Sequence, residues 1–297
     1  MDAAVNGRER VWVNPALQLR SATAFLRFLA VFIMANVSSL DGSVLKRTVV
    51  CNTCAKYRCS NARSIMGPYE KAWQATRRRI EDAARAANRP PGSVRLLAVS
   101  KTFPAAAVRS VHASGQRAFG ENYVQEAIDK RAALADVTDV AWHLIGPLQG
   151  NKAGAAAATF DAVETIDRAR IAERLSAARA PARGALDVLV QVNVSGEANK
   201  HGVDPPAALA LARYVATLPN LRLRGIMGIP ESTADIPRLR AQFRALAACY
   251  ERCREAGLGV DTLSMGMSAD FELAIAEGAT EVRVGSAIFG ERRKVST

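Results

Sequence analysis

The chain has 297 residues, of which 49% are hydrophobic, and its mean hydropathy is near zero, as expected for a globular protein with a substantial buried core. The formal net charge is +12, but residues 1–65 contain nine Lys/Arg and three Asp/Glu and supply half of that excess. The remaining positive charge is spread along helix-patterned segments without an aromatic-interleaved basic face, so we expect no nucleic-acid partner.

The first 65 residues differ in character from the rest of the chain. Their apolar segment ATAFLRFLAVFIMANV includes Arg27 and is shorter than the roughly 20 residues that span a bilayer, so we expect no membrane partner. No clear small-residue cleavage site follows, which argues against a signal peptide. We interpret residues 1–65 as an N-terminal extension, poorly ordered or produced by a mis-set start codon, and residues 66–297 as one domain.

The cysteines do not predict a metal site. Cys51, Cys54 and Cys59 lie in CNTCAKYRCS, and a CxxC pair can supply half of a zinc site, but no second pair or paired histidines follow at suitable spacing. Cys249 and Cys253 are four residues apart in a helical pattern and should share one face. Nothing in this cysteine usage indicates an oxidising compartment, and we expect a cytoplasmic protein.

From residue 69 onward, short apolar runs alternate with helical patterns. The predicted strands cover 94–99, 117–119, 140–145, 160–165, 186–193, 221–228, 260–264 and 281–284, and the helices between them lie near 104–114, 122–134, 150–158, 168–179, 205–218, 235–256 and 269–277. This alternation implies parallel strands joined by right-handed crossovers. The predicted fold class is therefore α/β, a single (β/α)8 TIM barrel. A doubly wound sheet would normally have a Gly-rich loop after its first strand, where this chain has VSKTFP.

Candidate functional residues follow the predicted strands, at the end where barrels place their sites. Lys101 follows the first strand, and the loops LSMGMSAD and RVGSAIFG follow the last two, where barrels frequently bind phosphate. Glycines let backbone N–H groups approach an anion, and hydroxyls add donors. The candidate phosphate-binding residues are Ser264, Gly266, Gly285 and Ser286. A lysine amine that faces a phosphate site suits pyridoxal 5'-phosphate (PLP), because the amine can form a Schiff base with its aldehyde.

Several longer motifs support this cofactor. AVSKTFP, FGENYVQEA, WHLIGPLQGNK, NVSGEANKHG, LRGIMGIP and LSMGMSADFELAIAEGATEVRVGSAIFG together resemble the pyridoxal phosphate homeostasis protein family over about residues 69–291. The resemblance implies a barrel like the alanine racemase N-terminal domain, which is PLP fold type III. It also implies Lys101 as the PLP-linked lysine, and a phosphate held by Ser264, the backbone of Met265, Gly285 and Ser286.

Two further residues match the family near the cofactor. Arg283 matches an arginine close to the pyridine nitrogen, and Asn122 matches an asparagine beside the cofactor. The implied function is a monomeric, non-catalytic protein that buffers PLP or delivers it to PLP-dependent apoenzymes, and so maintains intracellular vitamin B6 homeostasis. No catalytic residue is assigned. His143, Trp142 and Phe119 are interpreted as structural or packing residues.

Other interpretations remain open at this point. A PLP-dependent amino-acid racemase is the main alternative, although such racemases use a second domain that supplies a tyrosine, and this chain ends thirteen residues after Val284. A structural protein with an incidental lysine is another. Lys200, in NVSGEANKHG, should open on the same face as Lys101 and is a possible secondary PLP amine. It could instead be a solvated loop lysine that steers the anionic cofactor.

Overall fold

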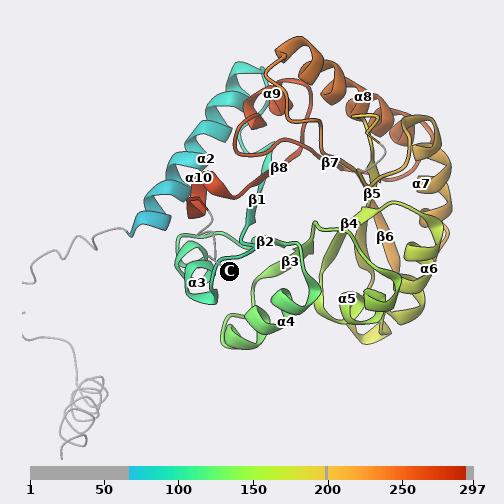
Figure 1. The fold of residues 1–297 in the computed structure, drawn as a ribbon, viewed down its shortest axis with the longest axis horizontal. Helices are drawn as coiled ribbons and strands as arrows, with labels where there is room; N and C mark the ends of the chain where they lie inside the picture. The colour runs from blue at the N-terminus through green and yellow to red at the C-terminus, as the bar shows by residue number, and fades with distance from the viewer. Residues whose placement is uncertain (1–66, 198–199, 292–297) are drawn as a thin grey trace, which may run out of the picture. The chain divides into compact units, whose positions relative to one another are not determined.

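The protein folds as a closed eight-stranded barrel surrounded by helices, in a computed structural model that describes residues 67–197 and 200–291 (Figure 1). Neighbouring strands pair in parallel around the ring, and β1 closes it by pairing with β8. The strands are β1 (Arg95–Val99), β2 (Ala118–Glu121), β3 (Ala141–Leu144), β4 (Ala162–Ile166), β5 (Leu186–Val192), β6 (Leu221–Gly228), β7 (Thr262–Ser264) and β8 (Glu281–Val284). The predicted (β/α)8 barrel is confirmed.

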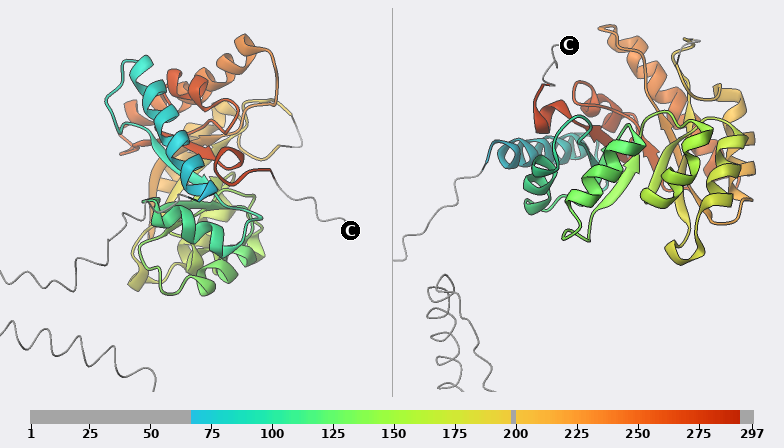
Figure 2. Two further views of the ribbon diagram at one scale, coloured as in Figure 1. Left: turned by 90° about the vertical axis from the view of Figure 1, so that its left-hand side faces the viewer. Right: turned by 60° about the horizontal axis from the view of Figure 1, so that its bottom comes forward.

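Helices lie along the outside of the strands in each view of Figure 2. They are α2 (Pro68–Ala86), α3 (Ala105–Ala113), α4 (Val124–Ala133), α5 (Ala153–Thr159), α6 (Ala169–Ala178), α7 (Ala208–Ala216), α8 (Ile236–Glu255), α9 (Phe271–Ala276) and α10 (Ser286–Phe289). Short 3-10 turns cover Gly150–Lys152, Pro181–Arg183 and Pro205–Ala207. Helix α2 packs against α9 and α10, so the first described helix lies beside the last two.

Local sequence explains both kinds of element. In β1, the four residues after Arg95 are buried, as expected for a parallel strand covered on both faces. In α2, the buried residues Thr76, Ile80 and Ala84 recur every four positions and therefore lie on one face. Helix α8 begins after Asp235, whose side chain accepts a hydrogen bond from the backbone N–H of Arg238 at 3.0 Å. Such a cap stabilises a helix by about 1 kcal/mol.

The core lies between the strands and the surrounding helices. Phe119, Phe160, Phe243 and Phe271 are fully buried there, and truncating a buried Phe to Ala typically costs about 3–5 kcal/mol. Phe119 and the buried Trp142 have ring centroids 6.1 Å apart, so the packing role predicted for this pair is confirmed. Cys249 and Cys253 both lie on α8 as predicted, and both are buried.

Some expectations concern parts of the chain that the structure does not describe. The predicted extension over 1–65, its apolar segment and the Cys51–Cys59 motif lie outside the described residues. Within 67–197 and 200–291, no helix has the length and apolar character needed to cross a membrane.

Candidate cofactor-binding site

A cavity of about 760 Å³ opens where the strands end. This volume is within the range of roughly 300–1,000 Å³ that small-molecule sites occupy. Six of the residues singled out in the sequence line it: Lys101, Asn122, Lys200, Arg283, Gly285 and Ser286. They follow or end four different strands, β1, β2, β5 and β8, so closure of the barrel is what brings them together.

Lys101 is positioned by a buried polar network at the ends of β1 and β2. The ammonium of Lys130, on α4, donates to the carbonyl oxygen of Ser100 at 2.7 Å and to Oε1 of Glu121 at 2.7 Å. The Ser100 hydroxyl donates to the same Glu121 oxygen at 2.6 Å. Burial raises the pKa of Glu121, while the nearby Lys130 ammonium opposes that rise. Strand β2 ends at Glu121, beyond the predicted 117–119, because it stays paired with β3 as far as Glu121 opposite Leu144.

The residue after Lys101 has an unusual backbone conformation. Thr102 has a φ of 68°, in the left-handed region that a β-branched residue rarely occupies. Its N–H donates to Oε1 of Glu126 at 2.5 Å, and Glu126 also accepts from Lys130. A strained residue persists only where its surroundings hold it, so these bonds from α4 define the turn that presents Lys101 to the cavity.

Asn122 is a hydrogen-bond partner of Lys101, whose Nζ donates to Asn122 Oδ1 at 3.3 Å. The backbone of Asn122 is approached closely by Gly146, from the loop after β3. A Cβ atom at Gly146 would lie only 2.2 Å from the Asn122 carbonyl oxygen, so no larger residue fits without movement. This close approach explains why the first residue of the GPLQGNK segment is glycine. It also packs the loop after β3 directly against the backbone of Asn122.

Gly285 and Ser286 lie at the end of β8, beside Ser268, which the sequence did not predict as a site residue. The Oγ of Ser268 accepts from the N–H groups of Gly285 at 3.3 Å and Ala287 at 3.4 Å, and Ser268 lines the cavity. These distances exceed the usual 2.7–3.2 Å for N–H···O bonds. A stronger acceptor could therefore replace the serine hydroxyl at these two donors. The sequence motif SMGMSAD contains two serines, so Ser268 could have been considered as a phosphate-binding residue beside Ser264.

Three other residues predicted to hold the phosphate, Ser264, Met265 and Gly266, are not among the residues that line the cavity. Ser264 is fully buried, donates to Oε2 of Glu164 at 2.7 Å and accepts from Nη1 of Arg283 at 2.8 Å. The N–H of Met265 bonds to the carbonyl oxygen of Glu281 at 3.1 Å. The Ser264 hydroxyl and the Met265 N–H, which were expected to contact the phosphate, thus already have hydrogen-bond partners within the protein.

Gly266 has a packing role in the structure. Its φ is +93°, and an added Cβ would lie 2.6 Å from the Cβ of Ala274 on α9. Glycine is therefore required for α9 to approach the β7 loop. Because that loop turns at Gly266, its next serine, Ser268, is the one that reaches the cavity.

Arg283 lines the cavity although only 4% of its surface is exposed. Its Nη1 donates to Ser264, and its Nη2 donates to the carbonyl oxygen of Gly228 at 2.8 Å. Burial lowers the pKa of Arg283, and the carboxylates of Glu164 and Glu281 oppose that change. Since arginine remains protonated in proteins, the cavity has a fixed cationic donor at this wall.

Lys200 also lines the cavity, in agreement with the expectation that its loop opens on the face of Lys101. Its Nζ forms an ion pair with Oε1 of Glu197 at 2.6 Å, and its side chain is 30% exposed. Asn193 supports this loop, because its Nδ2 donates to the carbonyl oxygen of Glu197 at 2.9 Å. The structure thus brings a second amine to the same cavity.

Comparisons with known proteins show the family and the fold of this chain. The profile of the family described as alanine racemase, N-terminal domain, matches residues 73–293. The pyridoxal phosphate homeostasis protein of Pseudomonas aeruginosa is 56% identical over 214 residues, which cover 72% of this chain and 91% of that protein. The one from Escherichia coli K12 is 46% identical over 218 residues, covering 73% and 93% of the two chains.

Solved structures show the same barrel. PipY of Synechococcus elongatus, with PLP bound, has a TM-score of 0.62 and 39% identity, and the match covers 71% of this chain and all of PipY. Alanine racemase of Corynebacterium glutamicum has a TM-score of 0.57 and 19% identity, with 75% and 62% of the two chains covered. The racemase match shows a shared fold alone.

Proposed function

Because this chain belongs to the pyridoxal phosphate homeostasis protein family, built on the alanine racemase N-terminal domain, we propose that it binds PLP in the cavity at the strand ends and buffers or delivers this cofactor. One observation carries the proposal: Lys101, Arg283, Ser286 and Ser268 line a single cavity. An amine, a guanidinium and hydroxyl donors are the groups that an aldehyde, a pyridine nitrogen and a phosphate require.

Lys101 is the residue that would hold the cofactor covalently. Its neutral amine adds to the PLP aldehyde, and loss of one water forms the Schiff base. Asn122 would accept a hydrogen bond from this nitrogen, as it does from the Lys101 amine. The turn set by Thr102 and Glu126 directs the lysine toward the cavity.

The phosphate would lie between the loops that follow β7 and β8. Ser268 and Ser286 supply hydroxyls there, and the N–H groups of Gly285 and Ala287 supply backbone donors. These two N–H groups make only long bonds to Ser268, so a phosphate oxygen could take them over. Ser268 replaces Ser264 in this assignment.

Arg283 would meet the pyridine nitrogen. A guanidinium beside this nitrogen donates a hydrogen bond to it and keeps it unprotonated, which weakens the ring as an electron sink. This supports a carrier, but a racemase is compatible with the same arginine. We place the carrier first because relatives named for PLP homeostasis are up to 56% identical, against 19% for the racemase. Recipient apoenzymes, a monomeric state and a cytoplasmic location are part of this proposal.

The proposal is tested by absorbance spectroscopy with purified protein and PLP. A Schiff-base band should form in the wild type and in Lys71→Ala, which changes an exposed lysine on α2, but not in Lys101→Ala. Borohydride reduction and peptide mapping should then place the adduct on Lys101. An adduct found chiefly on another residue would overturn the assignment. Racemase, transaminase or decarboxylase turnover at about 1 per second or more with common amino acids would favour an enzyme instead.

A further inference from the structure

A chain of hydrogen bonds crosses the interior of the barrel from β3 to β8. Nδ1 of His143 lies 2.8 Å from Oε1 of Glu164. Oε2 of Glu164 accepts from the Ser264 hydroxyl at 2.7 Å. The hydroxyl oxygen of Ser264 in turn accepts from Nη1 of Arg283 at 2.8 Å. Ser264 and Glu164 are 100 residues apart and belong to β7 and β4, so this link exists only because the barrel closes.

Burial makes each bond in this chain important to Arg283. Glu164 and Ser264 are fully buried, and Arg283 is 4% exposed. A buried guanidinium needs both charge compensation and hydrogen-bond partners. Glu164 supplies the compensating negative charge, and the Ser264 hydroxyl links Glu164 to Arg283 by donating to the carboxylate and accepting from the guanidinium. The carbonyl oxygen of Gly228 holds Nη2 at 2.8 Å, so rotating the guanidinium plane would break at least one of two bonds.

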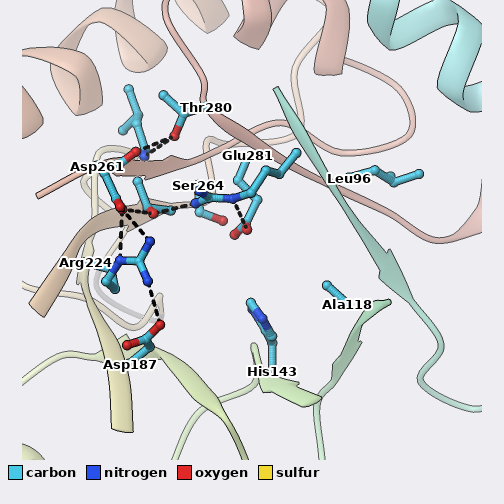
Figure 3. Close-up of polar contacts among 12 residues, drawn as sticks. Leu96, Ala118, His143, Asp187, Arg224, Asp261, Ser264, Thr280 and Glu281 are labelled. Carbon is cyan, nitrogen blue, oxygen red and sulfur yellow. Dashed lines mark hydrogen bonds and ion pairs between the residues drawn. The ribbon is translucent and has the colours of Figure 1, made fainter. Parts of the chain in front are cut away.

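This series of hydrogen bonds connects the two open ends of the barrel. Arg283 lines the cavity at the strand ends, whereas His143 and Glu281 line a second cavity of about 530 Å³ at the strand beginnings. His143 and Glu281 extend toward each other there, beside the Asp187–Arg224–Asp261 ion pairs (Figure 3).

A cation could in principle join this group, because His143, Glu164 and Glu281 offer ligand atoms within 4.8 Å of one another. Oε1 of Glu281 has no hydrogen-bond partner among the described residues. With Arg283 nearby, however, a divalent ion would leave a surplus positive charge in a buried space. Arg283 and Arg95, whose Nε lies 3.5 Å from Oε2 of Glu281, already balance the charges of these two carboxylates, which favours a hydrogen-bonded chain over a metal site.

We propose that Glu164 and Ser264 are positioning residues for the cofactor site, which fix the Arg283 guanidinium against the cavity, while His143 holds Glu164 from the opposite side. This inference rests on the proposed function, because Arg283 is the group assigned to the pyridine nitrogen. Arginine has five N–H donors in a rigid plane, and the two inward bonds determine where the remaining donors point. Neither positioning residue needs to touch the cofactor.

The test is a double-mutant cycle between Ser264→Ala and Arg283→Lys, with the dissociation constant for PLP as the readout. Ser264→Ala keeps every charge but breaks the link between Glu164 and Arg283. We expect it to weaken PLP binding about tenfold, the effect of losing a hydrogen bond to a charged group. If Ser264 acts through Arg283, the double variant should bind PLP within about twofold of Arg283→Lys alone.

The control is Ser176→Ala, which removes another buried serine hydroxyl, on α6, whose partner is the carbonyl oxygen of Pro219. It should leave PLP binding unchanged. Additive losses in the cycle, or a Ser264→Ala affinity within twofold of the wild type, would overturn the positioning role. Should Ser264→Ala fail to fold, Glu164→Gln keeps the side-chain shape and enters the same cycle, with the same non-additivity expected.

The two proposals fail in different ways. If the wild type forms no Schiff base on Lys101, the proposed function and the positioning role both fall. If the wild type forms it but the losses are additive, only the positioning role falls. The absorbance spectrum and the affinities thus separate the two results without any catalytic assay.

Discussion

The side chains of Lys101 and Asn122 meet across the ends of β1 and β2, where Nζ donates to Oδ1 at 3.3 Å. Replacing the amide by a carboxylate, in Asn122→Asp, places a negative charge beside the nitrogen that would carry the Schiff base. An opposite charge at this distance favours the protonated form. We therefore expect the Schiff base to lose its proton at a pH about one unit higher, measured by absorbance titration. The exposed Asn151→Asp is the control, and equal shifts would contradict the prediction.

Ser268→Ala tests the phosphate assignment. Loss of this hydroxyl should weaken PLP binding about tenfold, because a charge-assisted hydrogen bond to the phosphate is lost. Binding of pyridoxal, which has the aldehyde and the ring but no phosphate, should be unchanged. Both affinities can be measured by absorbance at equilibrium. Equal losses for the two ligands would show that Ser268 acts on the fold of the loop instead.

Lys200→Arg tests whether the second amine accepts PLP during transfer. Arginine preserves the charge, and with it the attraction for an anionic ligand and the ion pair with Glu197, but its guanidinium forms no Schiff base under ordinary conditions. If Lys200 is a transient acceptor, release of PLP to an acceptor apoenzyme should slow while the Lys101 spectrum remains intact. The control is Lys71→Arg on the exposed surface of α2, which should leave the transfer kinetics unchanged. Unchanged kinetics in Lys200→Arg as well would contradict the acceptor role and leave Lys200 as a residue that only attracts the anionic cofactor.

A chain that begins at Met66 should fold and bind PLP like the full-length protein. The reason is that all eight strands and the cavity-lining residues follow position 66. The checks are the unfolding midpoint in urea and the PLP dissociation constant, each compared with the full chain. Loss of the cofactor or of solubility on truncation would show that residues 1–65 are part of the domain.

His143 should make stability depend on pH. Burial opposes its charged form, but the facing carboxylates of Glu164, Glu281 and Asp161 outweigh burial and raise the pKa of His143 above its ordinary value. A pKa raised by folding stabilises the native state below the unfolded value of about 6.5, and this contribution is lost as the pH rises through the folded value.

The matching variant is His143→Gln, compared with the wild type by urea unfolding from pH 6 to 9. The difference in unfolding free energy should be largest, at about 1–3 kcal/mol, near pH 6 and should shrink as the pH rises. A difference that stays constant, or grows toward pH 9, would mean that His143 is neutral in the native state.

The sequence by itself determined the barrel and the end at which its cavity lies. Apolar runs such as Leu96–Val99 and the helical periodicity of α2 are local patterns, and the order of strands and helices decides parallel pairing. Lys101 and Gly285 could be placed at one face because the carboxyl ends of all strands converge there. The structure brings both to one cavity with Asn122, Arg283 and Ser286, while their roles in binding PLP stay predictions.

Only the tertiary structure decided which side chains reach the cavity and which turn inward. Ser264 and Ser268 are both serines of one loop motif, but Ser264 is still paired within the sheet and its hydroxyl enters the barrel interior. Its partner Glu164 is 100 residues away, on β4. Contacts across a barrel depend on how the ring closes and on the register of every strand pair, so no local pattern in the sequence specifies them.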